Sequence, residues 1–167
     1  CTDQEVLAKQ RSRKSGSRWQ LLYVSSMAQA KGYEDVLRAV GLLRKRGVEV
    51  AAQFAGRWET ANQAVTFAEL VGKLGLADSV EYLGPVSDRH EVKRLQLEAD
   101  VFLLPSRLTE GQPISILEAF NAGTPVVATS KGGMHGMYED GTAGRFVPEA
   151  DPTAIADALS EICRSEE

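Results

Sequence analysis

Two glutamates stand on either side of a proline in the sequence EGQPISILEAF, which spans residues 110–120. Glu110 stands in a stretch that contains glycine and proline, and Glu118 follows it within an apolar run. Pro113 suits the first turn of a helix, because its missing N–H would have no partner there. The sequence therefore predicts a loop that carries Glu110, followed by a helix that begins at Pro113 and carries Glu118.

The start of this helix is suited to bind an anion. The amides of Ile114, Ser115 and Ile116 have no acceptor within a helix, and the helix dipole adds a partial positive charge. Glu118 lies about 7.5 Å further along the axis, with its Cβ inclined toward the N-terminus, so it can accept hydrogen bonds from hydroxyls. Gly111 lets the loop backbone approach a ligand closely. These features describe a sugar-nucleotide site, but an exposed helix acid and an exposed loop acid explain the two glutamates equally well.

The rest of the chain alternates short apolar runs with longer amphipathic ones, which is typical of βα units on a parallel sheet. We expect strands at residues 19–25, 50–56, 80–84, 101–105, 125–129 and 144–147. We expect helices at residues 33–46, 60–74, 88–99, 113–122 and 153–163. These elements predict an α/β fold, a three-layer α/β/α Rossmann-like domain with a parallel sheet of about six strands.

The ligand site of such a fold lies at the carboxyl ends of the strands. In this chain, the loops at those ends are expected at residues 25–32, 56–59, 84–88, 105–113 and 129–136. The loop that carries Glu110 is one of them.

Composition narrows the choice of partner. The 167 residues are 43% hydrophobic and 25% charged, which predicts one globular domain at residues 19–167 after a linker or N-terminal extension at residues 1–18. A net charge of −4 gives no general attraction to nucleic acid or to an anionic membrane, so we expect a small-molecule partner. Without an apolar run long enough to span a bilayer, the chain is expected in the cytoplasm. Only Cys1 and Cys163 are present, which predicts neither a disulfide framework nor a zinc site.

Several segments resemble one enzyme family in the correct order. Residues 99–133, which contain EGQPISILEA, resemble the C-terminal, donor-binding domain of GT-B glycosyltransferases, especially the retaining family 4 group with its E-x7-E motif. Residues 23–40 (YVSSMAQAKGYEDVLRAV) are similar to the first strand, basic loop and helix of that domain, and residues 80–88 (VEYLGPVSD) to its base-contacting loop. Residues 138–159 are similar to its closing segment. The resemblance covers residues 19–163.

The resemblance implies a role for each matching residue. Glu110 contacts the transferred sugar near the reacting centre, Lys31 and the helix-start amides hold the diphosphate, and Glu118 binds the ribose hydroxyls. The implied catalytic residues are thus Glu110 and Lys31. The implied donor-binding residues are Glu118, Gly111, Gln112, Ile114, Ser115, Ser26, Val86 and Asp88. No D-x-D pair or carboxylate cluster is present, so we expect no metal and no cofactor beside the nucleoside-diphosphate sugar.

The sequence departs from the family pattern at three places. Pro113 stands where many relatives have a second glycine, so an amide that could contact the sugar is absent. Ser25 and Ser26 stand where the family has an arginine that helps to neutralise the diphosphate. Arg57 and Arg107 are the available substitutes, although each also fits an ordinary surface position. Gly136 stands where many relatives carry a glutamate.

The resemblance implies retaining transfer of a hexosyl group to an acceptor hydroxyl, with the helix-start amides and Lys31 stabilising the departing diphosphate. A GT-B enzyme pairs two Rossmann-like domains, and one domain accounts for this length. We therefore expect a donor-binding domain that is inactive without an N-terminal acceptor domain. The missing arginine leaves open a nucleotide-sugar sensor or interaction module without catalysis. An NAD-dependent Rossmann enzyme has less support, because no G-x-G-x-x-G follows the first strand, and nothing in the sequence favours a nucleotide-sugar epimerase.

Overall fold

The protein folds around one parallel sheet, with helices on both faces. The computed structural model describes residues 2, 4–6 and 18–165, and in that part of the chain six strands pair in the order β3-β2-β1-β4-β5-β6. The strands are β1 (Trp19–Val24), β2 (Val50–Ala55), β3 (Val80–Gly84), β4 (Val101–Leu104), β5 (Val126–Thr129) and β6 (Gly144–Val147). All neighbouring strands run parallel. The predicted three-layer α/β Rossmann-like fold is confirmed.

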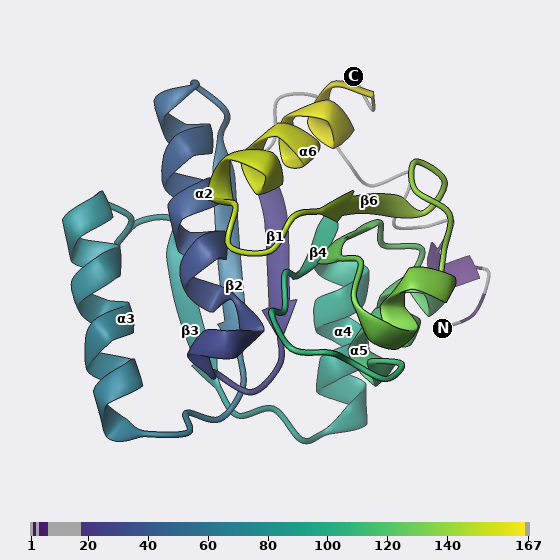
Figure 1. The fold of residues 1–167 in the computed structure, drawn as a ribbon, viewed down its shortest axis with the longest axis horizontal. Helices are drawn as coiled ribbons and strands as arrows, with labels where there is room; N and C mark the ends of the chain where they lie inside the picture. The colour runs from purple at the N-terminus through teal and green to yellow at the C-terminus, as the bar shows by residue number, and fades with distance from the viewer. Residues whose placement is uncertain (1, 3, 7–17, 166–167) are drawn as a thin grey trace.

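Five helices connect or follow these strands. They are α2 (Tyr33–Lys45), α3 (Ala61–Leu74), α4 (Arg89–Glu98), α5 (Ile114–Asn121) and α6 (Pro152–Ser165), with two short 3₁₀ helices, η1 (Gln29–Lys31) and η2 (Gly132–Gly136). In Figure 1, α2, α3 and α6 lie on one side of the sheet, and α4 and α5 lie on the other. Residues 4–6 are also helical. We expected a linker at residues 1–18. Of these, residues 1, 3 and 7–17 lie outside the described part of the chain.

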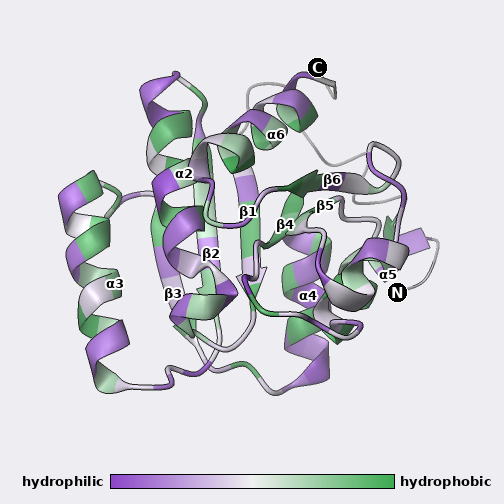
Figure 2. Ribbon diagram, viewed as in Figure 1, coloured by the Kyte–Doolittle hydropathy of each residue, from purple (hydrophilic) through white to green (hydrophobic). Residues whose placement is uncertain are grey.

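The core forms because the central strands are apolar on both faces. Every residue of β4 and of β5 is buried, as a parallel sheet between two helical layers requires. On α2, Val36, Leu37, Val40 and Leu43 recur at helical spacing and are fully buried. Figure 2 shows the same division, with hydrophobic and hydrophilic stripes around the outer helices.

The strand order creates a reversal beside β1. From β1 the chain proceeds outward to β2 and β3, then crosses to the opposite side of β1 to form β4. The loops that follow β1 and β4 therefore leave the sheet in opposite directions. Ligands of open α/β sheets bind in the crevice at this switch point, outside the carboxyl ends of the strands.

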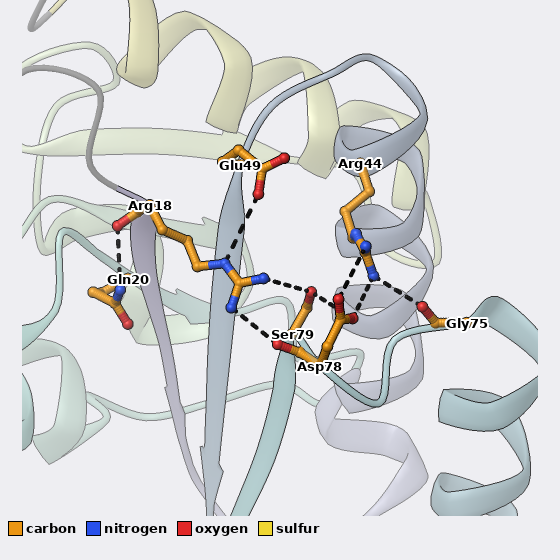
Figure 3. A network of polar contacts seen from close by, with 7 residues as sticks. All are labelled: Arg18, Gln20, Arg44, Glu49, Gly75, Asp78 and Ser79. Carbon is orange, nitrogen blue, oxygen red and sulfur yellow. Dashed lines mark hydrogen bonds and ion pairs between the residues drawn. The ribbon is translucent and has the colours of Figure 1, made fainter.

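A polar network lies at the amino ends of the strands, at the opposite end of the sheet from this crevice (Figure 3). Arg18, just before β1, donates to the carbonyl of Asp78 at 2.9 Å and to the hydroxyl of Ser79 at 3.3 Å. Arg44, near the end of α2, binds both carboxylate oxygens of Asp78, at 2.7 and 3.3 Å. The network joins the end of α2 to the start of β3, which is a structural role.

Among the described residues, no helix has both the length and the apolar character needed to cross a membrane. The cytoplasmic location stays a prediction.

Candidate functional site

Lys31 and Glu110 meet at the switch point of the sheet. Lys31 ends η1 in the loop after β1, and Glu110 lies in the loop between β4 and α5. The Lys31 Nζ is 2.5 Å from the Glu110 Oε1, and the two side chains keep only 19% and 13% of their exposure. The topology thus brings together the two residues that the sequence assigned to catalysis, although 79 positions separate them.

Ser106 is a third member of this cluster, which the sequence did not identify. Its hydroxyl donates to the same Glu110 Oε1 at 2.5 Å and accepts a hydrogen bond from the Leu108 amide at 3.2 Å. Ser106 is fully buried. A serine after an apolar strand carries no periodicity or spacing signal, so only the folded loop reveals its partner.

The loop after β4 is fastened to the segment after β1. The Arg107 amide donates to the Ala30 carbonyl at 2.8 Å, and its guanidinium contacts the Asp35 Oδ2 at 2.8 Å. Asp35 is buried in the first turn of α2. Gly32 has a φ of 82°, and a Cβ at this position would lie 2.2 Å from the Pro105 carbonyl oxygen. The two halves of the switch point therefore pack backbone against backbone.

This contact decides the role of Arg107. The hydrogen bond that the Arg107 guanidinium donates to the Asp35 carboxylate raises the pKa of the guanidinium, with a further Coulombic contribution from the same carboxylate. Its charge is thus compensated within the protein, which argues against Arg107 as the substitute for the family arginine. Arg57, the other candidate, is exposed in the loop after β2.

The loop after β5 holds the opposite side of the Glu110 segment. The Gly133 amide donates to the Glu110 carbonyl at 2.8 Å. A Cβ on Gly132 would lie 2.1 Å from that carbonyl oxygen, and a Cβ on Gly133 would lie 2.2 Å from the carbonyl oxygen of Gly111. Close backbone packing therefore positions Glu110 from both neighbouring loops.

The side chain of Tyr23 holds the loop after β1 through hydrogen bonds. Its side chain is buried, and its hydroxyl donates to the carbonyls of Ser26 at 3.2 Å and Lys31 at 3.4 Å. Burial raises the pKa of the Tyr23 phenol well above its usual value, so the hydroxyl stays protonated. The sequence indicated Tyr23 only as part of an apolar strand.

The start of α5 differs from the prediction by one residue. Pro113 is the N-cap, with φ −61° and ψ 121°, and the helix begins at Ile114. Because the extended ψ aims the Pro113 carbonyl along the helix, that carbonyl accepts from the Ile116 amide at 3.1 Å. The expectation that the Ile116 amide is free was therefore wrong. The amides of Ile114 and Ser115 donate to no acceptor within the described part of the chain, and they remain available to an anion.

The other predicted residues lie in the expected loops. Glu118 is half-buried on α5, one turn after Ile114 and about 6 Å along the axis. Gly111 and Gln112 are exposed beside Glu110, and Ser26 is exposed after β1.

The predicted base-contacting residues lie in the loop after β3. Val86 is half-buried and packs against the core. The Asp88 Oδ1 accepts from the His90 amide at 2.9 Å and so caps α4. No interaction within the described residues joins this loop to Glu110 or Glu118.

A pocket lies outside the cluster of Lys31, Ser106 and Glu110. This pocket of about 430 Å³ between α3 and β3 is lined by apolar and aromatic side chains, namely Trp58, Ala64, Phe67, Ala68, Val71, Val80 and Tyr82. None of the predicted site residues lines it.

Residues 2, 4–6 and 18–165 contain no group of three or more His, Cys, Asp or Glu side chains that could hold a metal ion. A metal-independent reaction stays a prediction.

Comparison with known proteins identifies the family. The family model of the glycosyl transferases group 1 matches residues 5–167. The chain therefore belongs to this glycosyltransferase family.

Curated relatives carry related names. The putative colanic acid biosynthesis glycosyltransferase WcaL of Salmonella typhimurium is 33% identical over 152 residues, which are 87% of this chain and 36% of WcaL. The D-inositol 3-phosphate glycosyltransferase of Mycolicibacterium gilvum is 33% identical over 140 residues, which are 84% of this chain and 31% of that protein. The chain thus spans about a third of the length of these relatives.

Solved structures share the fold. HepE from Anabaena, in complex with UDP-glucose, superimposes with a TM-score of 0.83 at 18% identity, over 99% of this chain and 44% of HepE. The C-terminal domain of LpcC, a glycosyl transferase group 1 family protein from Francisella tularensis, gives a TM-score of 0.78 at 22% identity, over 94% and 81% of the two chains. These likenesses show a GT-B type Rossmann-like domain.

Proposed function

We propose that this chain is the donor-binding domain of a retaining, family 4 type glycosyltransferase and that it binds a nucleoside-diphosphate sugar. The observation that carries the proposal is the arrangement at the switch point. An ammonium group, a carboxylate and two helix-start amides stand on neighbouring loops, from Lys31, Glu110, Ile114 and Ser115, and the two amides have no acceptor among the described residues. A diphosphate flanked by two sugars has the matching charges and hydroxyls.

Each residue then has a distinct task. The amides of Ile114 and Ser115, with Lys31, hold the diphosphate, where negative charge increases as the bond to the sugar breaks. Glu118 accepts hydrogen bonds from the ribose hydroxyls. Glu110 contacts the transferred hexose, as an acceptor hydroxyl approaches the anomeric carbon on the face that gives retention.

The remaining donor-binding residues surround this centre. Gly111 and Gln112 continue the loop beside the sugar, Ser26 lies beside the diphosphate, and the loop with Val86 and Asp88 holds the base. The acceptor is bound by an N-terminal domain of the same enzyme, and no metal takes part.

A titration of this chain with sugar nucleotides tests the proposal. The complex of HepE with UDP-glucose makes UDP-glucose the first probe, followed by GDP-glucose and ADP-glucose. We expect calorimetry to detect saturable binding of at least one of the three. Binding of none would refute a donor-binding domain.

A second candidate function is a nucleotide-sugar sensor or interaction module without catalysis. It is favoured by Ser25 and Ser26 in place of an arginine, and by the engagement of Arg107 with Asp35. Glu110→Gln in the complete enzyme separates the two functions. Transfer by the unaltered protein that Glu110→Gln abolishes, with donor binding retained, supports the enzyme. Donor binding without any transfer by the unaltered protein supports the module.

A further inference from the structure

The two oxygens of the Glu110 carboxylate have different surroundings. Oε1 accepts from the Lys31 ammonium and from the Ser106 hydroxyl, each at 2.5 Å. Oε2 receives no hydrogen bond from any residue in the described part of the chain. One oxygen is therefore anchored by two donors, and the other remains for a ligand.

The hydroxyl of Ser106 has a defined direction. Because it accepts from the Leu108 amide at 3.2 Å, its own hydrogen is directed to the remaining partner, the Glu110 Oε1. A hydroxyl that donates to a carboxylate makes a charge-assisted hydrogen bond, which is shorter and stronger than a neutral one. Ser106 thus fixes the rotation of the carboxylate as well as its position.

The sheet in turn holds Ser106. Its amide donates to the Leu104 carbonyl at 2.9 Å, and its carbonyl accepts from the hydroxyl of Thr129, the last residue of β5. Both Ser106 and Thr129 are buried. Lys31, by contrast, is a longer and partly exposed side chain, whose ammonium is the group that a diphosphate would attract. Ser106 is therefore the donor to Glu110 that stays in place when a ligand enters.

We infer that Ser106 is a positioning residue for Glu110, which it orients so that Oε2 is presented to the hydroxyls of the transferred sugar. This inference rests on the proposed function, because it assigns the sugar to Glu110. It adds that Ser106 strengthens the binding of the nucleotide sugar more than the binding of the nucleotide without its sugar. Without the Ser106 hydroxyl, the carboxylate would keep only the lysine, which the diphosphate also attracts.

The first test needs no ligand. In the isolated chain, the ¹³C resonance of the Glu110 side-chain carboxyl should shift in Ser106→Ala. Ser160→Ala is the matched control, since it removes another buried serine hydroxyl, which donates to the Ala156 carbonyl at 2.7 Å on α6. The control should leave the Glu110 resonance in place.

The second test compares UDP-glucose with UDP by calorimetry. Ser106→Ala should weaken UDP-glucose about tenfold and change UDP less than about twofold, because only the sugar contacts Glu110. In a Glu110→Ala background, Ser106→Ala should have no further effect on the binding of UDP-glucose. A merely structural serine would weaken both ligands alike, and would do so in either background.

The inference is overturned by an unchanged Glu110 resonance, by equal weakening of the two ligands, or by additive losses in the double variant. If the unaltered chain binds none of UDP-glucose, GDP-glucose and ADP-glucose, the proposed function fails instead; if it binds one of the other two, that donor and its nucleotide replace UDP-glucose and UDP in the second test. The resonance then decides by itself whether Ser106 positions Glu110.

Discussion

Lys31 contributes a positive charge at the mouth of the sheet, and its replacement should affect ligand binding more than folding. We expect Lys31→Met to weaken UDP binding by about tenfold or more, because a charge-assisted hydrogen bond to phosphate is lost. Calorimetry at several salt concentrations measures this, and the variant should also show a smaller dependence on salt.

Lys73→Met is the control for this experiment, since Lys73 is exposed in the last turn of α3. It should leave the affinity for UDP unchanged. An equal loss in both variants would mean that Lys31 acts only through the overall charge of the domain.

Arg107 should matter for stability, because its partner Asp35 is buried. We expect Arg107→Met to lower the free energy of unfolding by about 2 kcal/mol, since a buried carboxylate loses its counter-charge while the partly exposed arginine moderates the effect. Urea denaturation measures the change.

A matched control lies on α2, the helix that also carries Asp35. Arg38 pairs with Glu34 at 3.7 Å and is half exposed, so Arg38→Met should cost less than about 0.5 kcal/mol. Similar losses in the two variants would show that the Asp35 pair is as weak as a surface pair.

At the scale of single residues, the sequence pointed to Lys31 and Glu110, which the structure brings together, but not to the residues that hold them. Lys31, Glu110 and Glu118 were singled out because a motif and a helix start carry them, and their contact with a ligand stays a prediction. Ser106 was missed because its contact with Glu110 depends on an irregular loop. The pairing of Asp35 with Arg107 was missed because 72 positions separate the two residues, and no local pattern encodes such a contact.

The connection between η1 and α2 depends on Gly32, and two glycines with nearly the same φ can test it. Gly32 has a φ of 82° and Gly47 a φ of 79°, but an added Cβ meets the Pro105 carbonyl oxygen only at Gly32. Gly47→Ala should cost about 1 kcal/mol of unfolding free energy, from the positive φ alone. Gly32→Ala should cost about 3 kcal/mol or more, because the loop after β4 must also move.

Chemical denaturation of the two variants gives the comparison directly. Equal losses would mean that the loop after β4 yields to the added methyl group without cost. The contact with Pro105 would then be no constraint on the site.

At the scale of elements, apolar runs predicted all six strands to within one residue of their ends. Buried parallel strands leave this signal because both of their faces are covered. The 3₁₀ helices η1 and η2 were not predicted, since so short a turn has no hydrophobic period. The start of α5 was misplaced because proline fits both the N-cap, where it stands, and the first helical position.

At the scale of the whole molecule, we expect this chain to bind a sugar nucleotide but not to transfer the sugar. Because the chain spans about a third of its curated relatives, we expect the isolated chain to bind UDP-glucose but to transfer no glucose. The complete enzyme should do both in an assay with radiolabelled donor. Robust turnover by the isolated chain would contradict this division of labour.

The amino-terminal residues also contact the domain. Glu5 accepts from the Lys93 ammonium of α4 at 2.7 Å, and this hydrogen bond lowers the pKa of the Glu5 carboxyl to about 2. Since the folded-state pKa is depressed, the contact stabilises the fold above the ordinary value of 4.5 and is lost as the pH falls through about 2.

We expect Lys93→Met to return the Glu5 titration toward pH 4.5, as measured by NMR. Arg94→Met is the control, because Arg94 pairs with Glu91 and Glu98 instead. A normal Glu5 titration in the unaltered chain would show that residues 4–6 are not held by α4.

The close packing of Gly132 and Gly133 against the Glu110 segment has a consequence for engineering. Any side chain at these glycines displaces the backbone of the Glu110 loop, whereas Gln112, Ile114 and Leu117 are exposed around it. A directed-evolution library that randomises the three exposed positions should retain folded members and sample new donor preferences. Randomising the two glycines should mostly yield misfolded or inactive clones, so donor preference in this scaffold is best altered from the rim of the site.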